Sequence, residues 1–346
     1  ARFSNSEQVL VLYGDVPLIT TETLQDLIES GDNNSLKVLT AILEDPTGYG
    51  RIVRDYDDNM LCITEEKDAD EETKLINEIN TGIMCIPAKW LTEALSQLDN
   101  NNAQGEYYLT DLIAKAVNQG IEINSVTCED EMEVAGINNR VQLAEVESYY
   151  QQLKATELMM SGVTFRDPAR VDIRGDIKAG QDITIDINVI FEGNNTIADN
   201  VSIGANCIII NSVIHEGAEI LPNSIVENAE VGTNCSVGPF ARLRPGTKLA
   251  AKAKVGNFVE VKNANIGLGS KINHLSYIGD TDMGADVNIG AGTITCNYDG
   301  ANKHRTVIGD RVFVGSDTQL VAPVTVEDGA TIGAGSTIRK TAPADS

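Results

Sequence analysis

The second half of the chain repeats an aliphatic residue every six positions. A hexapeptide with one inward aliphatic side chain makes one short strand and one corner, so three hexapeptides close a triangular coil of about 18 residues. A single coil cannot bury its apolar side chains, and stacked coils form the core together. The period therefore predicts a left-handed parallel β-helix over residues 164–346. Its clearest run is Val237, Leu243, Leu249, Val255 and Val261, and the period returns over 266–278 and 308–338.

One polar segment interrupts this repeat. The residues between Thr295 and Ile308 read CNYDGANKHRTV, which is too long for one strand and too polar for the core. We expect the segment to loop out of its coil, and extruded loops are where solenoid proteins place binding groups.

The first 140 residues have a different, mixed pattern, which is typical of an α/β domain of the Rossmann-like kind. The apolar run at 9–15, VLVLYGD, predicts a fully buried parallel strand that ends in a loop. Because such a strand needs neighbours on both sides, we expect the domain to be incomplete at its N-terminus. Strands are also predicted at 37–43 and 121–127, and helices at 21–30, 88–98 and 107–118.

Residues 141–160 contain no glycine or proline and space their apolar residues at helical intervals. We therefore predict three parts: an α/β domain at 1–140, a linker helix at 141–163 and the β-helix at 164–346.

Composition limits the partners. The chain carries 26 basic and 51 acidic residues, a net charge of −25, which repels phosphate backbones and anionic membranes, so we expect neither nucleic acid nor membrane as a partner. Its six cysteines are spread singly, and no apolar leader precedes the first domain. These features predict a cytoplasmic protein without disulfides or a cysteine metal site.

The period also places charged side chains. Arg244 and Lys262 each follow an inward residue, and the 18 residues between them put one a coil above the other, about 4.8 Å apart. Two stacked cations in an acidic chain suggest a phosphate site. The alternative is a pair of solvated surface charges.

His274 comes two residues after the inward Ile272 and should point outward. An exposed imidazole can accept a proton from an amine near neutral pH. The alternative is an ordinary surface histidine. A zinc site with His215 and His304 would need neighbouring subunits, because these residues lie on distant coils or in the loop.

In the first domain, Asp15 follows the predicted buried strand, at the sheet edge where α/β proteins bind ligands. A carboxylate there can hold Mg²⁺ together with phosphate oxygens, or it can simply cap the next helix.

Eight segments, in order along nearly the whole chain, resemble the bacterial bifunctional glucosamine-1-phosphate N-acetyltransferase / N-acetylglucosamine-1-phosphate uridylyltransferase family. They are YGDVPL (13–18), DPTGYGRI (45–52), EINTGI (78–83), NNNAQGEYYLTD (100–111), GINNR (136–140), GPFARLRPG (238–246), VGNFVEVK (255–262) and NIGAGTITCNYDGANK (288–303).

The resemblance implies acetyl transfer from acetyl-CoA to glucosamine 1-phosphate, for peptidoglycan and lipopolysaccharide precursors, by a homotrimer with its acetyltransferase sites between neighbouring β-helices. It implies His274 as general base. Sugar-phosphate residues would be Arg244, Lys262, Tyr277 and Asn288. Acetyl-CoA residues would be Ala291, Asn297, Tyr298, Lys303, Ser316 and Ala334.

The resemblance further implies uridylyl transfer from UTP to N-acetylglucosamine 1-phosphate, which yields UDP-N-acetylglucosamine and pyrophosphate. It assigns Mg²⁺ to Asp15 and Asn138. The nucleotide-sugar residues would be Tyr13, Gly14, Asp15, Gly50, Glu65, Asn80 and Asn138.

Two features of the family are missing from this sequence: a glycine-rich nucleotide loop ahead of YGD and a C-terminal tail with an arginine. For the chain as it stands, we expect impaired binding of UTP and weakened binding of acetyl-CoA. Two other hypotheses remain: a nucleotidyltransferase whose β-helix only regulates or trimerises, and a non-catalytic solenoid scaffold.

Overall fold

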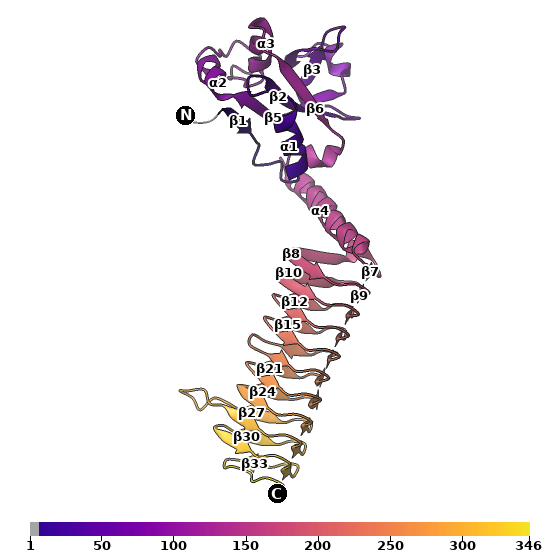
Figure 1. The fold of residues 1–346 in the computed structure, drawn as a ribbon, viewed down its shortest axis with the longest axis vertical. Helices are drawn as coiled ribbons and strands as arrows, with labels where there is room; N and C mark the ends of the chain where they lie inside the picture. The colour runs from indigo at the N-terminus through magenta and orange to yellow at the C-terminus, as the bar shows by residue number, and fades with distance from the viewer. Residues whose placement is uncertain (1–6) are drawn as a thin grey trace. The chain divides into compact units, whose positions relative to one another are not determined.

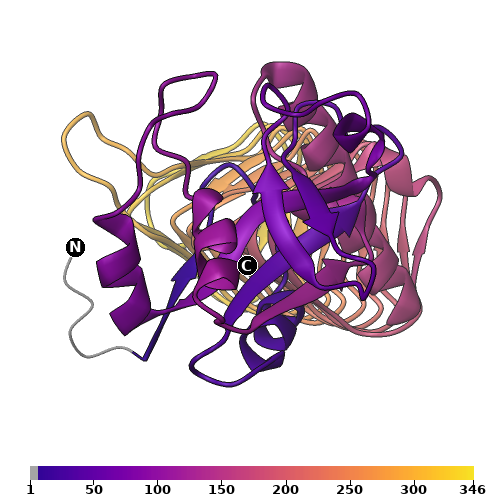
Figure 2. The same cartoon turned by 90° about the horizontal axis from the view of Figure 1, so that it is seen from above.

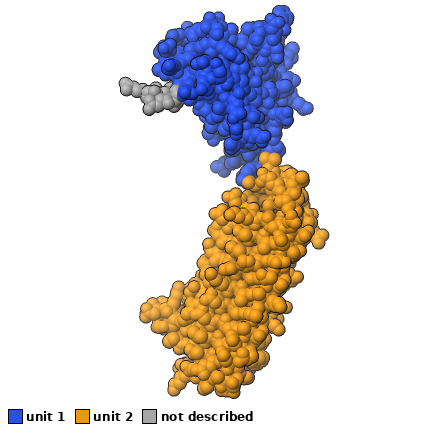
Figure 3. All heavy atoms as spheres, in the orientation of Figure 1, with its two compact units in different colours: residues 1–150 blue, residues 151–346 orange. Residues whose placement is uncertain are grey.

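The computed structural model describes residues 7–346, so the expected start of the first domain at residue 1 lies outside the described part. The chain forms two compact units, residues 1–150 and 151–346 (Figure 3). Each unit has its own apolar core.

The first unit is a six-stranded mixed sheet with helices around it (Figure 1). The order is β4-β3-β5-β2-β6, and β1 also pairs with β5. Neighbouring residues Val38 and Leu39 enter different apolar clusters, so the sheet has a core on both faces. The strands are β1 Gln8–Val11, β2 Leu36–Ile42, β3 Arg51–Arg54, β4 Met60–Thr64, β5 Glu78–Pro87 and β6 Ile123–Cys128. The helices are α1 Thr21–Glu29, α2 Ala88–Leu95 and α3 Asp111–Asn118, with short 3-10 turns at Thr73–Leu75 and Glu131–Val134.

The prediction of a fully buried parallel strand at 9–15 was wrong. β1 ends at Val11, is only half-buried and runs antiparallel to β5, with Val11 opposite Met84. Residues 84–87 are the end of β5, which pairs with β2 along one edge. Along its other edge, β3 pairs with β5 only at Ile79. β1 occupies the edge that this leaves.

The other predicted elements of this unit are present, with shifted ends. The third helix begins at Asp111 instead of 107, because residues 107–110 form a wall of a pocket described below. A turn ahead of a helix carries the same residue types as the helix, so the sequence pattern did not separate the two.

Helix α4, Arg140–Met160, follows, and the boundary between the two compact units falls within it. In the second unit, Gln151 bonds both backbone groups of Ile173, at 2.8 and 3.1 Å, and Ala155 is buried in the β-helix core. The end of α4 therefore covers the first coil. β7 already begins at Val163, the last residue of the predicted linker.

The second unit is a parallel β-helix whose coils have three faces (Figure 1). The first face consists of β7 Val163–Phe165, β9 Ile183–Ile185, β11 Ser202–Ile203, β14 Glu219–Ile220, β17 Ser236–Val237, β20 Lys254–Asn257, β23 Lys271–His274, β26 Asn288–Ile289, β29 Phe313–Val314 and β32 Thr331–Ile332. Two long strands, β8 Val171–Ala179 and β10 Val189–Ile197, begin the other two faces, after a 3-10 turn at Pro168–Arg170.

The second face continues with β12 Ile208–Ile210, β15 Ile225–Glu227, β18 Arg242–Leu243, β21 Glu260–Lys262, β24 Tyr277–Gly279, β27 Ile294–Cys296, β30 Gln319–Val321 and β33 Thr337–Ile338. The third face continues with β13 Val213–Ile214, β16 Glu230–Val231, β19 Lys248–Leu249, β22 Asn265–Ile266, β25 Thr281–Met283, β28 Thr306–Ile308 and β31 Val324–Val326.

The predicted phase is confirmed. Each strand pairs in parallel with the strand one coil on, as Leu243 does with Val261, and the phased aliphatic residues through Ile332 are buried, while Ile338 is partly buried. The corner between the first and second faces is turned by residues in the left-handed region, among them Phe258 (φ 58°) and Leu275 (φ 48°).

The polar segment after Thr295 leaves the coil as predicted. It separates β27 from β28 and stands clear of the coils in both views (Figures 1 and 2). Within residues 7–346, no helix is long and apolar enough to cross a membrane.

Candidate functional site

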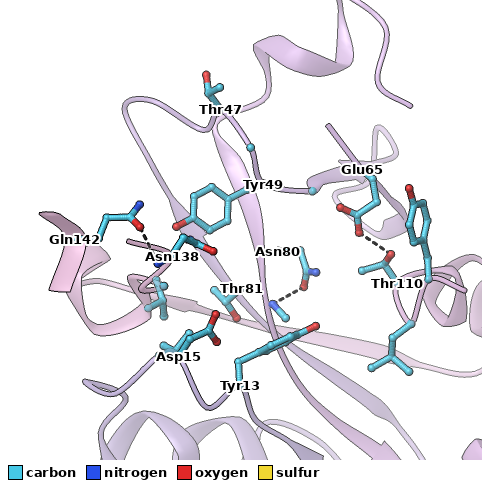
Figure 4. Close-up of a pocket in the computed structure, with 18 of the residues that line it drawn as sticks. Tyr13, Asp15, Thr47, Tyr49, Glu65, Asn80, Thr81, Thr110, Asn138 and Gln142 are labelled. Atoms are coloured by element: carbon cyan, nitrogen blue, oxygen red, sulfur yellow. Dashed lines mark hydrogen bonds between the residues drawn. The ribbon is translucent and has the colours of Figure 1, made fainter. Parts of the chain in front are cut away.

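A pocket of about 510 Å³ opens beside the sheet of the first unit (Figure 4). Its walls are the segments that follow β1, β2, β4 and β6, the segment before α3, and the middle of β5. Of the predicted nucleotide-sugar residues, the pocket is lined by Tyr13, Asp15, Gly50, Glu65, Asn80 and Asn138. Gly14 is not among the lining residues.

Hydrogen bonds fix the polar groups of this pocket. Thr110 donates its hydroxyl to Glu65 Oε1 at 2.8 Å, and Asn80 Oδ1 accepts the backbone N–H of Gly82 at 3.1 Å (Figure 4). These bonds hold the carboxylate and the amide in place before any ligand arrives, which lowers the cost of ordering them.

Tyr13 lies against the backbone of Gly82. A Cβ atom at Gly82, where φ is +82°, would sit 2.1 Å from Cε2 of the ring, so only glycine permits this contact. Partial burial, together with the negative charges of Glu65 and Asp15, raises the pKa of Tyr13, so its hydroxyl stays protonated and can donate a hydrogen bond.

Asp15 and Asn138 meet at one side of the pocket. The backbone N–H of Ile137 donates to the carbonyl of Asp15 at 2.9 Å, which joins their two segments. Both side chains offer oxygen atoms, the donors that Mg²⁺ prefers. Among residues 7–346 no group of three or more His, Cys, Asp or Glu could hold a metal ion. A divalent cation bound here would therefore take its remaining ligands from water or phosphate.

The sequence did not single out other residues of this pocket. Tyr49, Thr81 and Gln142 also line it, and Gln142 Oε1 accepts the backbone N–H of Asn138 at 2.8 Å. Tyr49 and Thr110 lie inside the motifs that carried the resemblance, so these motifs could have indicated both residues. Gln142 lies on a helix that the sequence showed only as a linker.

The second candidate site lies on the second face of the β-helix. Because Leu243 pairs with Val261, Arg244 and Lys262 occupy neighbouring positions one coil apart, as the phase predicted. Arg244 already has an anion, since its Nη1 lies 2.7 Å from Glu260 Oε1. Within residues 7–346 Lys262 makes no ion pair with a carboxylate. Glu260 thus orients one cation and leaves the other to a ligand.

Tyr277 reaches toward the same edge. Gly279, the coil partner of Lys262, has no side chain, and the Tyr277 hydroxyl lies over its backbone, 2.4 Å from where a Cβ atom would be. The hydroxyl is 3.5 Å from Nδ2 of Asn297. The phenol can therefore form the floor of a site bordered by Lys262.

Asp280 is a buried carboxylate that connects this edge to the extruded loop. It accepts hydrogen bonds from Asn263, at 2.5 Å, and from Asn297. Although burial opposes ionisation, these bonds and the charges of Lys262 and Lys303 lower the pKa of Asp280. The sequence did not indicate this residue, because its role depends on two partners that are each 17 residues away.

His274 stands at the opposite edge of the same face. It ends β23 and is exposed, and Leu275 then turns the corner into the strand that carries Tyr277. The span from His274 to Gly279 is five residues, at most about 17 Å between Cα atoms.

The imidazole of His274 is oriented by Asn257. Its Nδ1 lies 2.8 Å from Oδ1 of Asn257, directly above it in the stack. Since an amide oxygen only accepts, Nδ1 carries the proton and Nε2 keeps its lone pair, as a general base requires. The sequence analysis did not identify Asn257. Its spacing of 17 residues from His274, which is one coil, could have indicated that the two side chains are stacked.

Three of the predicted acetyl-CoA residues form a column below His274. Backbone hydrogen bonds from Gly292 to His274, from Asp317 to Ala291 and from Gly335 to Ser316 place Ala291, Ser316 and Ala334 on successive coils at this corner. All three side chains are small. They leave room for an extended chain that would run along the stack toward Nε2.

The remaining predicted residues lie elsewhere. Asn288 is on the first face, between Lys271 and Phe313, and does not join Arg244, Lys262 and Tyr277 on the second face. Asn297, Tyr298 and Lys303 belong to the extruded loop at the far edge of the second face. The predicted acetyl-CoA residues therefore fall into two groups at opposite edges.

Comparisons with known proteins agree with this architecture. Residues 173–277 match the family described as GMPPB C-terminal domain, and residues 305–340 match the bacterial transferase hexapeptide family, with six repeats. The bifunctional protein GlmU of Acinetobacter baylyi is 55% identical over 96% of this chain and 73% of its own length. The bifunctional protein GlmU of Marinobacter nauticus is 54% identical over the same shares. The structure of the Arabidopsis UDP-N-acetylglucosamine acyltransferase is 14% identical and covers 53% of this chain and 68% of its own, with a TM-score of 0.26, too low to support an argument.

Together, this architecture and these relatives define the class of the chain as a two-activity transferase, an acyltransferase joined to a nucleotidyltransferase. The identity to the curated relatives makes the assignment specific. The chain belongs to the bifunctional GlmU family.

The orientation of His274 can be tested by NMR on a sample labelled with ¹⁵N in its three histidines. We expect neutral His274 to carry its proton on Nδ1, and Asn257→Ala to shift it toward the Nε2–H form that free imidazole favours. The signals of His215 and His304 serve as internal controls, and His274→Gln identifies the peak. An Nε2–H form in the unmodified chain would contradict the assignment.

Proposed function

We propose that the β-helix transfers the acetyl group of acetyl-CoA to the amine of glucosamine 1-phosphate, with His274 as the general base. The observation that carries this is one arrangement: an exposed imidazole whose Nδ1 is held by Asn257 stands above a column of small residues, and two stacked cations lie on the face that begins at the same corner. The imidazole can accept a proton from the amine, the column can receive the thioester chain, and the two cations can bind the phosphate.

The cations at the far edge fix the sugar. Lys262 and the Glu260-held Arg244 bind the phosphate by charge-assisted hydrogen bonds, and Tyr277 supports the ring between them and His274. The amine on the adjacent carbon then points toward the corner of His274. Asn288, on the neighbouring face, would contact the sugar only from a second copy of the chain.

Chemistry begins when Nε2 of His274 accepts a proton from the sugar ammonium. The neutral amine attacks the thioester carbonyl carbon, a C–N bond forms, and the C–S bond breaks as the thiolate leaves. The imidazolium releases this first proton to solvent, and the neutral Nε2 then takes the remaining excess proton from the acylated nitrogen and passes it to the departing thiolate. Asn257 holds the ring throughout through Nδ1–H, so proton transfer requires no rearrangement of the imidazole.

The test is acetyl transfer from acetyl-CoA to glucosamine 1-phosphate by the full chain. We expect His274→Ala to lower kcat by about 10²–10⁴-fold, the usual contribution of a general base. The matched control is His215→Ala, because His215 also lies on the β-helix and its imidazole is likewise held by one side chain, Glu230. Equal activity of the chain and the His274 variant would refute the assignment.

In the first unit, we propose uridylyl transfer from UTP to N-acetylglucosamine 1-phosphate, which gives UDP-N-acetylglucosamine. Glu65 and Asn80 would bind sugar hydroxyl and amide groups, and the protonated Tyr13 would donate a hydrogen bond. Asp15 and Asn138 would hold Mg²⁺. When bound, the ion would offset the negative charge that accumulates on the phosphates.

The contact between Gly82 and Tyr13 predicts a coupled effect on UDP-N-acetylglucosamine binding. Gly82→Ala should displace the ring and weaken binding about tenfold, because the pocket loses its preset donor. Tyr13→Ala should have a similar effect, and the double variant should bind no worse than either single variant. Calorimetric titration of all four chains measures this. Additive losses would show that Gly82 acts independently of Tyr13.

We further propose a cytoplasmic homotrimer with each acetyltransferase site between two copies. Support comes from the division of the predicted acetyl-CoA residues: Ala291, Ser316 and Ala334 lie on one edge of the second face, and the extruded loop lies on the other. The loop of a neighbouring copy can meet the column of the first. Acetyl-CoA and UTP are cytoplasmic metabolites, which is consistent with this location.

A shared site predicts complementation between inactive variants. Co-expressed His274→Ala and Tyr298→Ala/Lys303→Ala chains should regain about a quarter of the unmodified activity, because a random half of the columns meets a random half of the intact loops. A mixture of His274→Ala with His274→Gln is the matched control and should regain none. Failure of the first mixture would place each complete site within one chain.

A further inference from the structure

The extruded loop is an ordered hairpin although it has no apolar core. The backbone N–H of His304 donates to the carbonyl of Asn297 at 2.7 Å, and Tyr298 pairs with Lys303 in an antiparallel bridge. Most of its side chains are exposed. A hairpin of this size is marginally stable alone, so its order depends on polar contacts.

Carboxylates hold the base of the hairpin on both sides. Asn297 donates to the buried Asp280, and the guanidinium of Arg305 makes a two-point ion pair with Asp282. These contacts attach the hairpin to the coil. They do not fix the tip, which lies beyond them.

The tip is held by Asp299 and His304. Oδ1 of Asp299 accepts the backbone N–H groups of Ala301 and Asn302, at 2.8 and 2.6 Å, and its Oδ2 lies 2.7 Å from Nε2 of His304. The backbone bond from Asn302 and the bond from His304 keep the pKa of Asp299 well below its usual range. The carboxylate is therefore ionised whenever His304 donates to it.

The alternation of side chains in a hairpin separates Asp299 and His304 from Tyr298 and Lys303. Tyr298 and Lys303 are directly opposite each other, so they share one face of the hairpin. Asp299 and His304 are each one position further along and share the other face. The pair braces the hairpin from behind, away from the two side chains proposed to meet acetyl-CoA.

We propose that His304 and Asp299 form a positioning clip that holds Tyr298 and Lys303 in the conformation that binds acetyl-CoA, without touching the cofactor themselves. The inference rests on the proposed acetyltransferase function. An isolated surface ion pair contributes little to the stability of a folded domain. Here the pair acts on a hairpin without a core, whose tip is otherwise held by the backbone bond from Asp299 to Asn302 and by the bond from the Tyr298 hydroxyl to the Gly300 carbonyl. Loss of one charge-assisted bond should therefore lower the fraction of time for which the tip is ordered.

The test is steady-state kinetics of the full chain, with acetyl-CoA and glucosamine 1-phosphate varied separately. His304→Ala should raise KM for acetyl-CoA about three- to tenfold, the loss expected for one hydrogen bond. It should leave kcat and KM for the sugar within about twofold. His304→Gln, which retains an N–H donor, should recover most of the loss. Asp299→Ala should match or exceed His304→Ala, and the double variant should equal Asp299→Ala.

The outcomes distinguish a failure of the proposed clip from a failure of the proposed acetyltransferase function. An unchanged KM for acetyl-CoA in His304→Ala, or an equal rise of KM for both substrates, overturns the clip. A fall in kcat with no change in either KM overturns it too, because His304 would then belong to the chemistry. His215→Ala is the matched control and should behave as the unmodified chain. If the unmodified chain transfers no acetyl group, it is the proposed function that fails.

Discussion

The parallel pairing of each coil with the next is the constraint on which the acetyltransferase half depends. One inward aliphatic side chain per hexapeptide cannot be buried until another coil covers it, so the core forms only if equivalent positions stack. Stacking then fixes every outward position as well. Leu243 above Val261 places Arg244 above Lys262, and the same rule places Asn257 above His274.

Such a scaffold offers chemistry chiefly at its corners. A strand of two to four residues leaves few outward positions. At the corners, residues in the left-handed region turn the chain, and inserted loops can project away from the core. His274 and Lys262 stand at two edges of one face, and Tyr277 lies between them. The width of a face therefore sets the length of the ligand that can span it, while the column below His274 extends along the stack. In the proposed reaction the sugar phosphate lies across the face and acetyl-CoA lies along the stack.

Acidic residues organise this site as much as the cations do. Glu260 pairs with Arg244, Asp280 joins two asparagines beside Lys262, and Asp299 orders the tip of the hairpin. The net charge of −25 would repel an anionic substrate at long range. Close to the site, each carboxylate is already hydrogen-bonded or paired, so the field that a bound phosphate meets is dominated by the nearby cations.

The sequence alone determined the β-helix and its phase, because a repeat of six leaves no other way to bury the aliphatic residues. It also indicated the residues that we propose to carry the chemistry, through motifs that lie on strand ends and on the extruded loop. Tertiary structure decided what depends on partners distant in the chain. β1 pairs antiparallel to β5 because strands compete for a free edge, and Asn288 faces away from Lys262 because a corner lies between them. The tautomer of His274, the contact of Tyr13 with Gly82 and the role of Asp280 follow from side-chain distances, which no spacing along the chain specifies.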